Sequence, residues 1–217
     1  MNSWRHHPAL VRCLPFGLFL GLLVIGPYLP VSWAVISRTV LVGAVLIWCW
    51  PTYVDLRQPP STSTLHWLLA LAAGFAIFGI WIFLDHDWVM FSRSGGFDPR
   101  APDGTLDWPI TLTRLLGLVV VVPLMEELFW RSFLLRWLER HDFVTVAPRQ
   151  VGTRAFLITT VLFAVEHNQW LAGAIAGATY SWLYIRSGNL WVPVIAHAVT
   201  NGALGIWILY TRNWQFW

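Results

Sequence analysis

Two adjacent glutamates and an arginine interrupt an otherwise apolar and aromatic stretch, PLMEELFWRSFLL, at residues 123 to 135. On a helix, Glu127 and Arg131 lie four residues apart on one face, where they can form an ion pair. Glu126 points about 100° away from that face and has no local partner of this kind. An unpartnered carboxylate in an apolar place is suited to general acid or base catalysis, because desolvation disfavours its charged form. The spacing therefore predicts that Glu127 is paired and that Glu126 is available for proton transfer.

Two later apolar stretches each contain a histidine. In TTVLFAVEHNQW, Phe163 and His167 are four residues apart, with Glu166 next to the histidine. In VPVIAHAVTNGALG, His197 and Asn201 share one helix face by the same spacing. Ionisable side chains inside membrane segments usually face the interior of a helix bundle and mark a functional site. A glutamate, two histidines and an asparagine are sufficient for hydrolysis without a serine or cysteine nucleophile.

The composition that surrounds these residues is typical of a membrane protein. Of the 217 residues, 57% are hydrophobic and 12% are charged, and the mean hydropathy is +0.58, whereas about a quarter of the residues in soluble domains are charged. A helix needs about 20 apolar residues to cross the hydrocarbon core of a bilayer. The sequence contains seven candidate spans, with eight as the alternative count, at about 13–30, 33–50, 65–84, 109–135, 154–168, 170–186 and 190–210. We therefore predict an all-α polytopic membrane protein.

The predicted domain organisation and orientation follow from the same spans and from the loop charges. We expect a single integral membrane domain over residues 1–217, with a motif-bearing catalytic core at about 109–210. The longest loop carries more aspartate than arginine, whereas arginines occur at the N-terminus and in the alternate loops: Arg5, Arg12, Arg57, Arg136, Arg140, Arg149, Arg154 and Arg186. By the positive-inside rule the N-terminus is cytoplasmic. The basic residues are scattered rather than clustered, which argues against a nucleic-acid surface.

The three polar stretches resemble the motifs of a known family. EELFWR, FAVEH and HAVTN match EExxxR, FxxxH and HxxxN of the CAAX prenyl protease and bacteriocin-processing (CPBP) intramembrane endopeptidases, in the same order over residues 126–201. The resemblance implies that Glu126 and His167 activate a water molecule. It also implies that His197 and Asn201 form an oxyanion site. The chain would then be an integral protein of a bacterial cytoplasmic membrane that cleaves a membrane-associated peptide or protein in the lipid bilayer.

The same resemblance assigns supporting roles to other residues. It implies that Glu127 and Arg131 are mainly structural and that Phe163 belongs to the second motif. The motifs do not specify Glu166, which is therefore a second candidate for the catalytic base. We expect no cofactor, with zinc as the alternative, and the sequence indicates no oligomeric state.

Three other classes of function use similar residues. A zinc hydrolase would use Glu126, His167 and His197 as ligands with water in the fourth position, but the sequence has no HExxH motif. A proton-coupled transporter should show inverted repeats or broken helices, and the sequence indicates neither. A non-catalytic membrane scaffold would not need the motif residues. We favour the metal-free peptidase, because Asn201 beside His197 adds a hydrogen-bond donor that an oxyanion site needs and a zinc site does not.

Overall fold

The protein consists of α-helices joined by turns and one long loop. The computed structural model describes residues 7–93 and 96–217; Arg5, which contributes to the predicted orientation, lies outside them. In chain order the helices are α1 (Pro8–Ile25), α2 (Val31–Cys49), α3 (Val54–Arg57), α4 (Thr64–Phe83), α5 (Trp108–Leu116), α6 (Val122–Glu127), α7 (Leu135–Trp137), α8 (Thr153–Glu166), α9 (Trp170–Ser187) and α10 (Trp191–Thr211). In the described part of the chain, extended pairing is limited to an isolated antiparallel bridge between Arg100 and Leu106. The predicted all-α class is confirmed.

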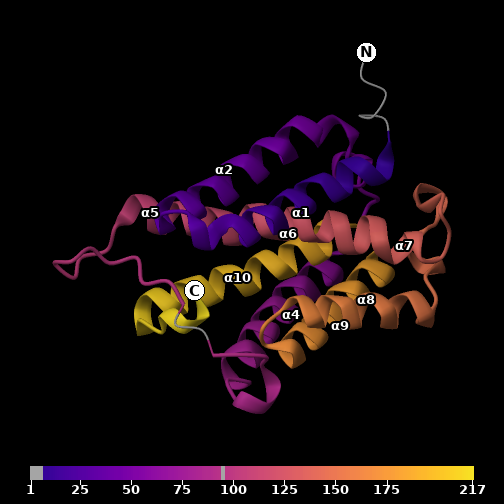
Figure 1. Ribbon diagram of the computed structural model, residues 1–217. Helices are drawn as coiled ribbons and strands as arrows, with labels where there is room; N and C mark the ends of the chain where they lie inside the picture. Colours follow the sequence, from indigo (N-terminus) through magenta and orange to yellow (C-terminus); the bar gives the residue numbers. More distant parts are fainter. Residues whose placement is uncertain (1–6, 94–95) are drawn as a thin grey trace.

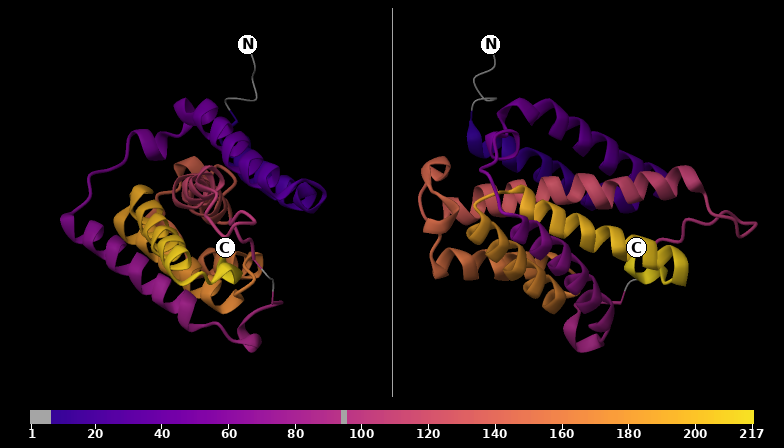
Figure 2. Two further views of the ribbon diagram at one scale, coloured as in Figure 1. Left: turned by 90° about the vertical axis from the view of Figure 1, so that its left-hand side faces the viewer. Right: turned by 180° about the vertical axis from the view of Figure 1, so that it is seen from behind.

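The central element is the long helix formed by α5, α6 and α7, which runs from Trp108 to Trp137. Its start is capped by Asp107, whose side chain accepts a hydrogen bond from the Ile110 amide, and Pro109 occupies the first turn. In Figures 1 and 2 the α1–α2 hairpin lies on one side of this helix, and α4, α8, α9 and α10 lie on the other. The helix that carries both glutamates is therefore covered from opposite sides, which removes their side chains from solvent.

In the part of the chain that the structure describes, five helices are long and apolar enough to cross a membrane: Pro8–Tyr28, Val31–Thr52, Thr64–Phe83, Trp108–Trp137 and Trp191–Thr211. They correspond to five of the seven predicted spans. The other two predicted spans form α8 and α9, which differ from the prediction. Helix α8 has 14 residues, about 21 Å at about 1.5 Å per residue, and is shorter than the roughly 30 Å hydrocarbon core. Helix α9 has 18 residues but is less apolar, because glycine, serine, threonine, tyrosine and Arg186 interrupt it.

Two π-helical segments interrupt the long helix on either side of its glutamates. They cover Gly117–Val121 and Leu128–Leu134, and α6 lies between them. A π-helical turn holds more residues than an α-helical turn, so it changes the direction in which the following side chains point. The sequence predicts a regular α-helix here, and the π segments are a feature that it does not indicate.

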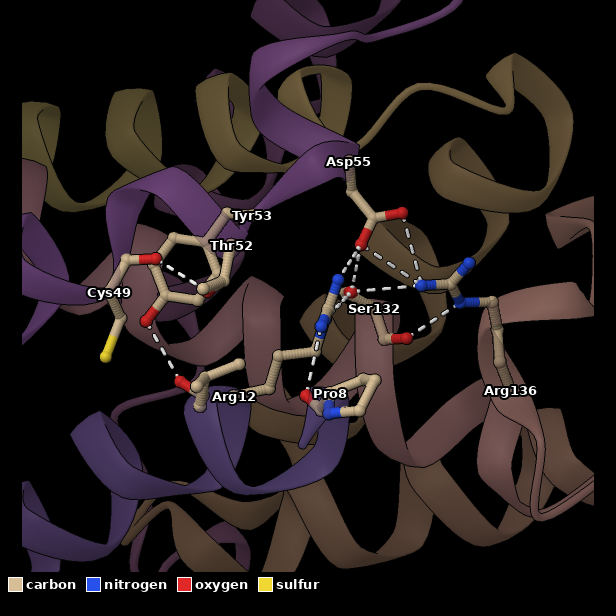
Figure 3. A network of polar contacts seen from close by, with 9 residues as sticks. Pro8, Arg12, Cys49, Thr52, Tyr53, Asp55, Ser132 and Arg136 are labelled. Atoms are coloured by element: carbon tan, nitrogen blue, oxygen red, sulfur yellow. Dashed lines mark hydrogen bonds and ion pairs between the residues drawn. The ribbon is translucent and has the colours of Figure 1, made fainter. Parts of the chain in front are cut away.

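A polar network ties the first two helices to the long helix (Figure 3). Asp55 of α3 accepts hydrogen bonds from Arg12 of α1 and from the Ser132 hydroxyl, both at 2.6 Å. Arg136 Nη2 lies 3.2 Å from both carboxylate oxygens of Asp55, and Arg12 Nε donates to Ser132 Oγ at 2.7 Å. Arg12, Ser132 and Arg136 are buried. Together these four residues form the Asp55 network, which fixes the α1–α2 hairpin to the helix that carries the glutamates.

The Asp55 network should make part of the stability dependent on pH. Burial by itself would raise the pKa of the Asp55 carboxyl, but the charges of Arg136 and Arg12 and the bond from Ser132 hold this pKa below its usual value. Because the folded-state pKa is the lower one, the stabilisation is fully present above the unfolded-state pKa of about 3.9 and is lost as pH falls through the folded-state value. We expect Asp55→Asn to remove this acid-sensitive part, as measured by denaturation in detergent micelles between about pH 5 and pH 2.

The matched control for this prediction is Asp142→Asn. Asp142 is exposed and forms no ion pair among the described residues. Its substitution should leave the acid dependence of unfolding as in the wild type. If Asp55→Asn also kept the full acid dependence, the network would not be its source.

Candidate active site

Two glycines on α9 let α8 approach closely enough to place its motif residues. A Cβ atom built on Gly173 would lie 3.0 Å from the His167 Cβ, and one built on Gly177 would lie 3.0 Å from the Phe163 ring. The two glycines are four residues apart and so share one face of α9. The small residues of LAGAIAGATYS, which the sequence predicts to let neighbouring helices approach closely, therefore set the positions of Phe163 and His167.

His167 is the first residue after α8, with an extended backbone (φ −98°, ψ 135°). Its Nδ1 atom lies 2.7 Å from the carbonyl oxygen of Phe163. Since a carbonyl only accepts, Nδ1 carries the proton and donates it, which satisfies one of the carbonyls at the end of α8. In the neutral ring the free lone pair is then on Nε2. His167 is thereby prepared to accept a hydrogen bond or a proton at Nε2.

Glu127 connects the first motif with the third. Its Oε1 accepts a hydrogen bond from Arg131 Nη1 at 3.1 Å and lies 3.0 Å from His197 Nδ1. The exposed fractions of Glu127, Arg131 and His197 are 0%, 1% and 5%. Arg131 also donates to the Gly177 carbonyl at 3.2 Å and lies over the Phe163 ring at 4.5 Å. The predicted Glu127–Arg131 pair is confirmed, and the structure adds that Glu127 holds His197.

Glu126 faces a cavity of about 240 Å³ whose wall also includes His167, His197 and Asn201. Glu126 is 5% exposed, and its Oε2 atom has no hydrogen-bond partner among the described residues. A buried carboxylate oxygen without a partner is energetically unfavourable, so it favours a water molecule or a substrate group in the cavity. The structure thus places the four predicted catalytic residues on one cavity. Their individual roles stay predictions.

Asn201 is held against the first π segment of the long helix. Its Nδ2 atom donates to the Leu118 carbonyl at 2.9 Å, which leaves the second N–H of the amide for another acceptor. The preceding residue, Thr200, is bonded to the Tyr180 hydroxyl at 2.7 Å, and the Tyr180 ring stacks on His197 with 5.0 Å between ring centroids. Tyr180 therefore fixes the plane of the His197 imidazole, a role that no motif indicates.

Glu166, the second candidate for the base, is placed differently from Glu126. Its Oε2 atom accepts a hydrogen bond from the Trp130 indole at 3.1 Å. Glu166 does not line the cavity that Glu126 faces. The geometry therefore favours Glu126 as the carboxylate that meets a substrate.

Three further residues position or cover the site. Trp81 and Phe216 line the cavity, and the Trp81 ring meets the His167 ring edge-on at 5.4 Å. Asn168 Oδ1 accepts from the Ser92 amide at 3.0 Å and Asn168 Nδ2 donates to the Ser92 carbonyl at 2.6 Å. The loop between α4 and α5 is thereby held next to His167. Only Asn168 gives a sequence signal, as a polar residue beside the histidine; Trp81 and Phe216 lie far from the motifs in the chain.

A zinc ion would require Glu126, His167 and His197 as a set of ligands. In residues 7–93 and 96–217 no group of three or more histidine, cysteine, aspartate or glutamate side chains is arranged to hold a metal ion. The Nδ1 atoms of both histidines are already bonded, to Phe163 and Glu127. As placed, these side chains do not form a three-ligand site. The metal content of the purified protein tests the zinc alternative.

Comparison with known proteins finds a family that part of this chain resembles. Residues 108–203, which contain all three motifs, match the family described as type II CAAX prenyl endopeptidase Rce1-like. A stretch of 86 residues, 38% of this chain, is 30% identical to the Bacillus subtilis protein named "Putative membrane peptidase YdiL". This match spans about a third of that relative, 32% of its length. No solved structure matches the chain. Residues 108–203 are therefore similar to the type II CAAX prenyl endopeptidase Rce1-like family.

Proposed function

We propose that the protein is an intramembrane endopeptidase that hydrolyses a membrane-associated peptide or protein with a water molecule activated by Glu126 and His167. The observation that carries this proposal is the buried Glu126 Oε2 atom without a partner, on a cavity that His167 also lines. The family match supports a peptidase rather than a scaffold. We place the N-terminus in the cytoplasm, on the basis of the loop charges.

The proposed reaction begins with a water molecule that donates hydrogen bonds to the Glu126 carboxylate and to His167 Nε2. Glu126 takes one proton, and the resulting hydroxide adds to the carbonyl carbon of the scissile amide, whose π electrons move onto the oxygen. Glu126 then gives its proton to the amide nitrogen as the C–N bond breaks. One water is consumed, and a carboxylic acid and an amine are released.

The developing oxyanion needs hydrogen-bond donors, which we assign to His197 and Asn201. His197 Nδ1 faces Glu127, so Nε2 also donates only when the ring carries both protons. The Glu127 carboxylate is a favourable neighbour for that positive charge. Asn201 has its second N–H, and a donor of this kind typically contributes about 3 to 4 kcal/mol to transition-state stabilisation. In this role Glu127 is a positioning residue for His197 as well as the partner of Arg131.

We expect peptide cleavage by the purified protein to survive treatment with strong chelators, because proton transfer by Glu126 requires no metal. The measurement is the cleavage rate of a membrane peptide, by mass spectrometry, together with the metal content of the protein. One tightly held zinc per chain, with activity lost on its removal and restored on its return, would contradict the proposal and make Glu126, His167 and His197 its ligands.

The substrate can be found by comparing the membrane peptides of cells that carry the wild type or Glu126→Gln. A peptide that accumulates only with the variant, and that the purified wild type cleaves, supports the proposal. If no peptide accumulates and the wild type cleaves none, the protein acts as a scaffold or a transporter instead.

A further inference from the structure

A second cavity, of about 150 Å³, lies between α2 and the beginning of the long helix. Arg38 of α2 and Arg114 of α5 both line it. The two helices touch closely beside it, since a Cβ atom built on Gly117 would come within 2.5 Å of the Thr39 hydroxyl. The arginines therefore project from two helices that are fixed relative to each other. The catalytic proposal uses neither of them.

Both arginines lack an acidic partner. Neither forms an ion pair within the described residues. Arg38 Nε donates to the carbonyl of Ala34. The Nε atom of Arg114 is buried and has no hydrogen-bond partner in residues 7–93 and 96–217, and the guanidinium lies over the rings of Phe97 and Trp217 at 5.6 and 5.9 Å. Two like charges on one small cavity repel each other, and a buried donor without an acceptor is unfavourable. An anion in the cavity would relieve both effects.

The cavity of the two arginines adjoins the catalytic cavity. Phe19, Leu118 and Val122 line both of them. We propose that Arg38 and Arg114 bind a carboxylate of the peptide substrate, an inference that rests on the proposed function. Guanidinium groups form paired hydrogen bonds with carboxylates, and the shared wall places such a group beside the cavity where the amide is cleaved. A lipid phosphate would pair with the same two arginines, but a lipid site would not need to share a wall with the catalytic cavity.

The distance between the two sites indicates where the carboxylate lies in the substrate. Arg114 precedes Glu126 by 12 residues, which is no more than about 18 Å along the long helix, because the π segment Gly117–Val121 lies between them. An extended peptide covers about 3.3 Å per residue. The carboxylate should therefore lie no more than about five or six residues from the scissile bond, at the C-terminus of the peptide or on an acidic side chain.

Binding of three apolar fluorescent peptides tests this inference. They share one sequence and carry a free C-terminal carboxylate, a C-terminal amide, or a C-terminal amide with one internal glutamate. Each is titrated into Glu126→Gln protein, which we expect not to cleave it, in nanodiscs of phosphatidylcholine. We expect at least one carboxylate peptide to bind about tenfold more tightly than the uncharged amide, because hydrogen bonds between charged groups are the stronger ones. Tighter binding of the peptide with a free C-terminus would indicate a site for a terminal carboxylate, and tighter binding of the glutamate peptide would indicate a site for a side-chain carboxylate.

The variants Arg38→Gln and Arg114→Gln should each abolish this preference. Both remove an unpaired charge from a poorly solvated place, so we expect them to fold at least as well as the parent. Arg212→Gln is the matched control, because Arg212 is exposed just after α10; it should keep the preference.

Equal binding of the three peptides would overturn the inference, and so would a preference that persists in both arginine variants. An anionic phospholipid that co-purifies with the wild type and is lost from both variants, without any peptide preference, would also overturn it and assign the cavity to lipid. The proposed function is tested separately by wild-type cleavage. If the wild type cleaves peptides but shows no preference for a carboxylate, only this inference is refuted. If binding shows a preference that depends on Arg38 and Arg114 but the wild type cleaves no peptide, the carboxylate site is supported and the catalytic proposal is refuted.

Discussion

Glu126→Gln is expected to remove peptide cleavage while leaving the fold intact. Glutamine has the same shape as glutamate but cannot take a proton from water. Loss of general acid–base catalysis typically reduces the rate by about 10²- to 10⁴-fold. Because the Oε2 atom of Glu126 has no hydrogen-bond partner in the described part of the chain, the substitution breaks no bond that the structure shows at that atom. We therefore expect kcat to fall by at least about a hundredfold with little change in KM, measured as peptide cleavage over time.

Glu166→Gln is the matched control for this prediction. It removes one carboxylate in the same way, but Glu166 is bonded to Trp130 and lies off the catalytic cavity. A glutamine oxygen can still accept the indole hydrogen bond, so we expect kcat close to that of the wild type. The opposite ranking, with Glu166→Gln inactive and Glu126→Gln active, would make Glu166 the base.

Glu127→Gln is expected to destabilise the fold strongly. Arg131 is 1% exposed, and the substitution leaves its charge without a counter-charge in a poorly solvated place. Removing one partner of a buried ion pair typically lowers the free energy of unfolding by about 3 to 5 kcal/mol. His197 loses the carboxylate at its Nδ1 atom in the same variant, so activity should fall as well. Denaturation in detergent micelles, followed by tryptophan fluorescence, measures the change.

An exposed ion pair supplies the comparison for this experiment. Asp98 pairs with Arg100 at the surface, where the two side chains are 40% and 35% exposed. Asp98→Asn should therefore lower the free energy of unfolding by no more than about 1 kcal/mol. If Glu127→Gln unfolded at the same denaturant concentration as the wild type, the buried pair would not stabilise the fold.

The positions of the helices could be predicted because they follow local patterns of apolar residues. The predicted segment 170–186 is Trp170–Ser187 in the structure, and 190–210 is Trp191–Thr211. Gly188, in a left-handed conformation with φ of 71°, ends α9 between them. The number of spans was harder to predict, because α8 is apolar but short and α9 is long but less apolar. The Glu127–Arg131 pair could be predicted because four residues on one helix face are a local relation.

Contacts between distant parts of the chain could not be predicted in this way. Glu127 and His197 are 70 residues apart in the chain, and helical spacing relates only residues within a few turns. The same holds for Trp81 and Phe216, which complete the cavity wall. In the sequence Asp55 is an isolated charge in a turn, and only the structure shows that Arg12 and Arg136 bind it. These features depend on how helices pack, which local periodicity does not encode.

The Asp55 network also has a consequence for the order of events during synthesis. Arg12 and Asp55 are 43 residues apart, whereas Ser132 follows Asp55 by 77 residues. At about 5 to 20 residues per second, the ribosome adds those 77 residues in about 4 to 15 s. Arg12 and Asp55 can therefore pair while the long helix is still being made. The first two helices can thus enter the bilayer with this ion pair already formed, and Ser132 and Arg136 join it when the catalytic helix arrives.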